Sequence, residues 1–197
     1  MKQRWLDPGP GFFEEGAVGL APRLIGCLIA NRIGRTLRSG LVVEVEAYTQ
    51  DDPASHAWRG RTGRNWPMFE KGGLAYVYFI YGMHTCFNVT AGPAGKGEAV
   101  LVRALEPVDG IEAMKGARGV EELRLLACGP GRLCQALGIT LEQSGSDLSS
   151  GPLRLYVPAR AEEPGIGVST RIGITRAADR PWRFYLRGSP FLSRRSS

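Results

Sequence analysis

LVVEVEAY at residues 41–48 and YVYFIY at residues 76–81 are two valine- and tyrosine-rich segments that predict β-strands. Side chains alternate between the two faces of a strand. One face of the first segment is therefore expected to carry Val43, Val45 and Ala47, and the other Glu44, Glu46 and Tyr48. The pattern predicts two carboxylates and an aromatic ring side by side on one sheet face.

The second segment, extended to residues 74–81, predicts one arm of a β-hairpin. HTCFNVT at 84–90 follows it after Gly82 and has the pattern of a partner strand. Tyr76 and Tyr78 share a face, and tyrosines in strands commonly pack in a core. Tyr81 falls on the opposite face, directly before the turn, where a large ring is expected to be exposed. An exposed aromatic ring on a basic protein can stack on bases or wedge between them.

The other segments mix short helices and strands. Residues 17–33 have a mostly apolar pattern compatible with a helix that Pro22 would start or bend. Asp109 with Glu112 resembles a capping box for a helix through about residue 117. The remaining expected elements are a loop over 49–73, a strand over 99–105, helices over 120–127 and 130–137, and short strands over 151–192. Because no regular βαβ rhythm appears, residues 1–197 are predicted to form one compact α+β domain around a curved, mainly antiparallel sheet with a protruding β-hairpin.

Length, composition and charge fit this expectation. The 197 residues are 43% apolar and 22% charged, as in an ordinary globular domain. The net charge of +6 favours a polyanionic partner. Most of the 25 basic residues are arginines, which suit bidentate phosphate contacts. A biased genome composition would give the same skew.

Several classes of protein are disfavoured. The four cysteines show no C-x-x-C spacing and the chain has only two histidines, so a metal site such as a zinc site is not predicted. No apolar run approaches the roughly 18 residues of a membrane span, and the N-terminus lacks a secretory pattern. The sequence predicts a cytoplasmic protein with reduced thiols and no membrane partner, nucleoid-associated if bacterial.

Glu46 is the candidate catalytic carboxylate. Glutamates on an arbitrary strand most often lie on a solvated sheet face. A carboxylate near an apolar, aromatic wall can instead activate a water as a general base. Tyr48, two residues later on the same face, supplies such a wall and favours the second interpretation.

Two arginine-rich segments are candidate phosphate-binding sites. HAWRGRTGRN at 56–65 holds Arg59, Arg61 and Arg64 beside a tryptophan. Such a loop is usually only solvated, but alternating charge, glycine and aromatic residues also suit contact with a nucleic-acid backbone. Arg132 lies at the start of the helix expected from Pro130, where free N–H groups can bind phosphate. Gly-Pro turns are common, so this second signal is weak.

Taken in order, these segments resemble the alkyladenine-type (3-methyladenine) DNA glycosylases, a mammalian-like family also found in bacteria. The resemblance runs from about Leu20 to Ser193 and rests on LVVEVEAY, HAWRGRTGRN, MFEKGGLAYVYFIYGMHTCFN, VLVRALEP, GPGRLCQALGI and RFYLRGSPFLS. It implies a monomeric base-excision-repair hydrolase that binds double-stranded DNA and needs no cofactor. The enzyme would flip an alkylated or deaminated purine out of the stack and hydrolyse its N-glycosidic bond, leaving an abasic site.

The resemblance also implies roles for individual residues. Glu46 would deprotonate the attacking water, and Arg103 would help to hold the water and the carboxylate. Three residues would sandwich the base: Tyr48, His56 and Tyr78. Asn88 would crowd the exocyclic amine of normal guanine.

Tyr81 would insert into the gap that the flipped base leaves, with Met83 packed beside it. Gly63, where many relatives have proline, is expected to loosen the arginine loop. Thr85 replaces an aromatic residue, so packing at the hairpin base is expected to differ. The alternative function is a non-catalytic nucleic-acid-binding module with the same basic surface and stacking tyrosines. Such a module gains nothing from a carboxylate near phosphates.

Overall fold

The computed structural model describes residues 4–9, 11–80, 84–159 and 165–194. They form three α-helices and a nine-stranded, open sheet in which every strand pair is antiparallel. The helices are α1 (Ala17–Leu24), α2 (Ile111–Arg118) and α3 (Pro130–Leu137). The 3₁₀ turns are η1 (Trp66–Phe69), η2 (Leu123–Leu125) and η3 (Leu141–Gln143). This architecture confirms the predicted α+β class and the mainly antiparallel sheet.

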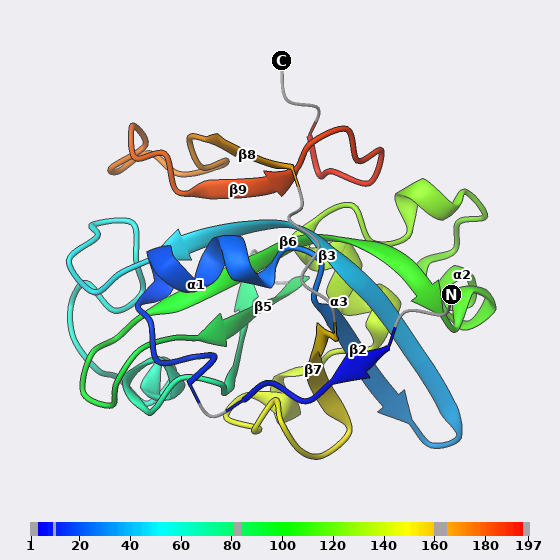
Figure 1. The fold of residues 1–197 in the computed structure, drawn as a ribbon, viewed down its shortest axis with the longest axis horizontal. Helices are drawn as coiled ribbons and strands as arrows, with labels where there is room; N and C mark the ends of the chain where they lie inside the picture. Colours follow the sequence, from blue (N-terminus) through cyan, green and yellow to red (C-terminus); the bar gives the residue numbers. More distant parts are fainter. Residues whose placement is uncertain (1–3, 10, 81–83, 160–164, 195–197) are drawn as a thin grey trace.

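The main path of the sheet runs β1-β7-β2-β3-β6-β5-β4, and β9 pairs with β3 and β8 outside this path. The strands are β1 (Trp5–Leu6), β2 (Leu28–Ile33), β3 (Thr36–Tyr48), β4 (Ala75–Ile80), β5 (His84–Thr90), β6 (Ala99–Asp109), β7 (Leu153–Pro158), β8 (Ile166–Ser169) and β9 (Arg183–Leu186). In Figure 1, α1 lies next to β3 and β6, and the orange β8–β9 ribbon runs along the upper side of the molecule. Helix α3 packs against β5 and β6, and α2 packs against α3.

β3 is the central strand, because its first half pairs with β2 and its second half with both β6 and β9. The sequence predicted that Val43, Val45 and Ala47 share one face of this strand, and this prediction is wrong for Val43. The register between β3 and β6 is irregular from Val42 to Val45, and the main hydrophobic core contains Val42 and Val45 rather than Val43. A β-bulge adds a residue on one strand and shifts the facing of its neighbours. The alternation resumes beyond it, with Val45 and Ala47 in the core.

The single helix expected over 17–33 is wrong. Helix α1 ends at Leu24, Gly26 has a φ of 85°, and residues 28–33 form β2 instead. Pro22 removes one intrahelical hydrogen bond near the end of α1. LIANRI then pairs with residues 36–41 across Gly34, which has a φ of 58°. A short apolar run is compatible with a buried strand as well as with a helix, and here the hairpin with residues 36–41 makes it a strand.

Two further expectations about helices fail, and three element predictions hold. Asp109 does not cap α2: Gly110 occupies the N-cap in a left-handed conformation, and Asp109 accepts a 2.6 Å hydrogen bond from Ser39 Oγ. Residues 120–127 contain only the turn η2. Helix α3 begins at Pro130 and ends at Leu137 as predicted. The predicted partners 74–81 and 84–90 appear as the antiparallel pair β4–β5, and strand 99–105 extends to Asp109 in β6.

Candidate active site

A cavity of about 270 Å³ opens beside the ends of β3, β4, β5 and β6. The structure brings five of the sequence-predicted site residues to its lining: Tyr48, His56, Tyr78, Asn88 and Arg103. Tyr76, Leu101, Ile172 and Gly173 also contribute to the wall. Aromatic and apolar side chains with a few fixed polar groups are typical of a site for a flat organic ligand.

The aromatic part of the wall is held by its own hydrogen bonds. The ring centroids of His56 and Tyr78 lie 4.5 Å apart in an edge-on arrangement, and His56 Nδ1 lies 2.9 Å from the hydroxyl of Tyr76. Asn88 Nδ2 donates a 3.0 Å bond to the backbone oxygen of Tyr76. Burial, with a smaller contribution from the charge of Arg64, lowers the pKa of His56 below its usual value. The aromatic wall is therefore cross-linked by hydrogen bonds, and its His56 ring is uncharged near neutral pH.

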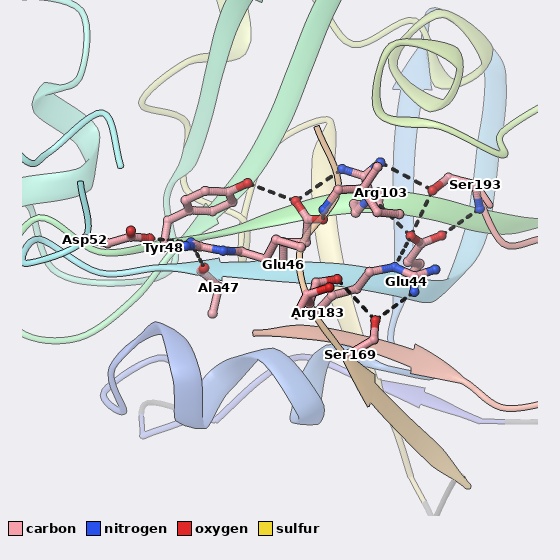
Figure 2. A network of polar contacts seen from close by, with 12 residues as sticks. Glu44, Glu46, Ala47, Tyr48, Asp52, Arg103, Ser169, Arg183 and Ser193 are labelled. Carbon is pink, nitrogen blue, oxygen red and sulfur yellow. Dashed lines mark hydrogen bonds and ion pairs between the residues drawn. The ribbon is translucent and has the colours of Figure 1, made fainter. Parts of the chain in front are cut away.

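Glu46 lies behind the wall, with a fully buried side chain. Its Oε2 accepts hydrogen bonds from Tyr48 Oη at 2.9 Å and from Arg103 Nη1 at 3.1 Å, and its Oε1 accepts one from the backbone N–H of Ile172 at 2.7 Å. Figure 2 shows the carboxylate between Tyr48 and Arg103. Glu46 is not itself among the lining residues, but all three of its donors are. Oε1, with one bond, retains capacity to accept another.

The two side-chain donors to Glu46 are held in their protonated forms. Burial, followed by the charge and hydrogen bond of Glu46, raises the pKa of Tyr48 far above its usual value. Burial opposes the charge on Arg103, but the carboxylates of Glu46 and Glu44 outweigh it and raise the pKa of that guanidinium. Tyr48 therefore remains a phenol, and Arg103 remains a cation.

The sequence placed Glu44 on the face of Glu46, as the spacing of two requires, but predicted no role for it in this cluster. Glu44 and Glu46 are both fully buried, so the alternative that they lie on a solvated sheet face is wrong. Glu44 Oε1 accepts bonds from Arg103 Nε at 3.1 Å and Arg183 Nε at 2.7 Å, and its Oε2 accepts one from the N–H of Ser193 at 2.6 Å.

Arg171 is another residue that the sequence did not single out. Its guanidinium carbon lies 4.6 Å from the centroid of the Tyr48 ring, and Nη1 pairs with the buried carboxylate of Asp52. Nη1 also donates to the backbone oxygen of Ala47 at 3.0 Å. The Arg171–Asp52 pair therefore supports Tyr48 from the side of the protein interior.

The four candidate phosphate-binding arginines lie in two places. Arg59, Arg61 and Arg64 are exposed on the loop after β3, and Arg61 forms an ion pair with Glu70 at 2.8 Å. Arg132 instead lines a second, more open hollow of about 500 Å³ at the start of α3, together with Arg118, Arg194 and Arg103. The two hollows share Arg103, Pro130 and Ile172. A cationic groove thus adjoins the aromatic cavity.

Two predicted site residues, Tyr81 and Met83, lie outside the described residues. No helix in the described part of the chain is long and apolar enough to cross a membrane. Within residues 4–9, 11–80, 84–159 and 165–194, no group of three or more histidine, cysteine or acidic side chains is arranged to hold a metal ion. The four cysteines are buried free thiols.

Comparison with known proteins gives one consistent result. A family model described as methylpurine-DNA glycosylase (MPG) matches residues 11–190. A protein of Methanoculleus marisnigri is 52% identical over 187 residues, which cover 93% of this chain and 97% of that protein. Proteins of Rhodopseudomonas palustris (strain HaA2) and Agrobacterium fabrum are 45% and 48% identical, covering 98% and 99% of this chain and 98% and 97% of their own lengths. All three carry the name "Putative 3-methyladenine DNA glycosylase".

Proposed function

Because this chain belongs to the methylpurine-DNA glycosylase family, and is thus a DNA-repair hydrolase of the 3-methyladenine DNA glycosylase type, we propose how its cavity performs that reaction. A damaged purine nucleotide leaves the duplex, and its base enters the tyrosine-lined cavity. Glu46 then activates a water that hydrolyses the N-glycosidic bond. Extrusion is needed because the bond is inaccessible while the base is stacked and paired. Family membership favours this enzyme over the non-catalytic binding module.

One observation carries the proposal: a buried carboxylate has all three of its hydrogen-bond donors in the wall of the cavity. Tyr48, Arg103 and Ile172 fix the direction of the Glu46 carboxylate. Oε1 carries a single bond, from the Ile172 N–H, so it is the oxygen with unused capacity to accept a hydrogen bond from water. A structural ion pair alone does not require its partners to line a cavity.

The proposed step is a balanced hydrolysis. The water oxygen forms a bond to C1′ of the deoxyribose as the bond from C1′ to the base nitrogen breaks. The electron pair of that bond stays on the base, so a cationic alkylpurine leaves as a neutral molecule, and the water proton passes to Glu46. Positive charge develops on the sugar, as in glycoside hydrolysis, and the negative charge of Glu46 stabilises it.

The wall also supports selectivity for damaged bases. Aromatic rings attract a cationic purine more than a neutral one, by on the order of 1–2 kcal/mol when the pair is desolvated. The lowered pKa of His56 keeps that ring neutral, so it does not repel a cationic base. Asn88, tied to the Tyr76 backbone, would crowd the exocyclic amine of normal guanine. A damaged base also unstacks more easily.

The remaining sequence-predicted residues would bind the duplex. Tyr81 would fill the gap left by the extruded base, and Met83 would pack beside it. Arg132 lies in the groove that adjoins the cavity, which suits it to a phosphate near the flipped nucleotide. The loop residues Arg59, Arg61 and Arg64 would contact more distant phosphates. One copy of the chain would carry out the reaction, since all of these groups belong to a single subunit.

The Glu46→Gln variant tests the proposal. It should bind duplex DNA containing an abasic-site analogue but release no 3-methyladenine from dimethyl-sulfate-treated duplex DNA. Glu98→Gln is the control, because Glu98 is also a buried carboxylate but bonds to Ala17 and Lys96 rather than to the cavity wall. Base release by Glu46→Gln at the rate of the unmodified protein would remove Glu46 from the proposed role.

A further inference from the structure

Glu44 has more fixed partners than the proposed catalytic carboxylate. In addition to Arg103, Arg183 and the N–H of Ser193, it accepts a 2.8 Å hydrogen bond from Ser193 Oγ. These partners come from β6, β9 and the segment that follows β9. Figure 2 shows Glu44 enclosed by Arg103, Arg183 and Ser193, on the side of Arg103 away from Tyr48. Glu44 therefore helps to attach the C-terminal segment to the site.

Arg103 connects the two carboxylates through separate nitrogens. Nε donates to Glu44, Nη1 donates to Glu46, and Nη2 donates to Ser193 Oγ at 3.4 Å. Because a guanidinium is planar, three partners in different directions fix both its position and its orientation. Glu44 and Ser193 provide two of these three, and neither lines the aromatic cavity. The direction of the Nη1–Glu46 bond thus depends on groups outside that cavity.

Glu44 also balances the charge of the cluster. Two carboxylates, Glu44 and Glu46, face two guanidiniums, those of Arg103 and Arg183. All four residues are at least nine-tenths buried, so water screens their charges little. Without Glu44, one uncompensated positive charge would remain beneath a sugar on which positive charge develops. Fixed charges aimed at a transition state are worth most in such an environment.

We propose that Glu44, held by Ser193, is a positioning residue: it orients Arg103 toward Glu46 and cancels the second arginine charge behind the site. This inference rests on the proposed function and deepens it. Neither residue touches the base or the reacting atoms. Their loss therefore slows the chemical step and leaves the binding of the flipped nucleotide largely intact.

The test separates chemistry from binding. Single-turnover release of methylated purines is measured on dimethyl-sulfate-treated duplex DNA with enzyme in excess, and affinity is measured on a duplex with an abasic-site analogue. Glu44→Gln, which keeps the shape and removes the charge, should lower the single-turnover rate by about tenfold or more, the effect typical of removing a group that orients a functional side chain. The dissociation constant should change by less than about threefold. Equal loss of rate and affinity would indicate a merely structural role and overturn the inference.

Two serine variants provide an independent test that leaves every charge in place. Ser193→Ala removes a hydroxyl bonded to Glu44 and should slow the single-turnover step several-fold, and Ser193→Thr, which keeps the hydroxyl, should restore it. Ser39→Ala is the matched control, because Ser39 Oγ donates to the carboxylate of Asp109 at the opposite end of β3. If Glu44→Gln fails to fold, the serine variants alone test the inference. Equal single-turnover rates for Ser193→Ala, Ser193→Thr and the control Ser39→Ala would overturn it.

Failure of this inference is distinguishable from failure of the proposed function. An unmodified chain that releases no methylated purine would remove the proposed function itself. An active chain that Glu46→Gln inactivates, but whose rate is unaffected by Glu44→Gln and Ser193→Ala, would leave the proposed function standing and remove only the role of Glu44.

Discussion

The Arg171–Asp52 pair gives the sharpest prediction about stability. Both side chains are fully buried, and Asp52 is the carboxylate that balances the charge of Arg171. The remaining bonds of Arg171, to the backbone oxygens of Ala47 and Ala177, carry no compensating charge. Asp52→Asn therefore leaves a buried cation unpaired, which costs about 3–5 kcal/mol of unfolding free energy.

The measurement is urea-induced unfolding followed by tryptophan fluorescence, with the free energy extrapolated to zero denaturant. Glu70→Gln is the matched control. It breaks the Arg61–Glu70 ion pair, whose side chains are 56% and 37% exposed, and exposed pairs contribute about 0–1 kcal/mol. The double variant Asp52→Leu/Arg171→Met should recover most of the loss, because an apolar pair of similar volume leaves no buried charge.

Two results would refute this reasoning. If Asp52→Asn and Glu70→Gln lower the unfolding free energy by similar amounts, burial of the pair does not determine its value. If the double variant is as unstable as Asp52→Asn, the loss comes from packing rather than from the unpaired charge. The stack of Arg171 on Tyr48 adds a functional readout. Because Tyr48 is proposed to contact the flipped base, a displaced Tyr48 should also slow the release of methylated purines from dimethyl-sulfate-treated duplex DNA.

Three further predictions follow from single positions. The pKa of His56 is lowered in the folded protein, so as the pH falls through about 6.5, the usual pKa of histidine, the unfolded chain takes up a proton before the folded one does. The free energy of unfolding should therefore fall more steeply below that pH in the unmodified protein than in His56→Asn, and identical pH curves would contradict this. Gly110→Ala should lower the free energy of unfolding in urea by about 2 kcal/mol or more, because φ is 74° and the added Cβ would clash with the backbone oxygen of Leu37. Gly151→Ala, with φ of 78° and open space around the added Cβ, should cost only about 1 kcal/mol. Tyr81→Ser should weaken binding to an abasic-site duplex more than to a single strand, and equal losses on both would argue against intercalation.

Local patterns made part of the fold predictable. The alternating tyrosines before Gly82 and the pattern of residues 84–90 identify a hairpin from neighbouring residues alone, and Pro130 marks the first turn of α3. Residues 28–33 could not be assigned in this way, because an apolar run of six suits a helix or a buried strand. Their pairing with residues 36–41 across Gly34 is local, but their second pairing, with β7, joins residues far apart along the chain and cannot be read from a local window.

In the site, too, contacts between neighbouring residues were predictable, and contacts between residues far apart in the sequence were not. The spacing of two places Glu46 and Tyr48 on one face, and the structure joins them by a hydrogen bond. The Asp109 capping box failed because the competing partner, Ser39, lies 70 residues away. The bonds from Arg183 and Ser193 to Glu44 join residues separated by 139 and 149 positions. Without an assumed sheet order, the sequence offers no reason to connect them.

The charge cluster behind the cavity is better explained by chemistry than by stability. Desolvating four charged side chains is costly, and replacing a buried ion pair by apolar residues of similar volume is often neutral or stabilising. The interior around β3 and β6 already contains Val42, Val45, Val100 and Val102, so an apolar solution was available to the sheet. What an apolar cluster could not supply is a fixed carboxylate whose donors form the wall of a cavity. The electrically balanced arrangement of Glu44, Glu46, Arg103 and Arg183 therefore supports the proposals that this part of the sheet serves the reaction and that Glu44 orients Arg103.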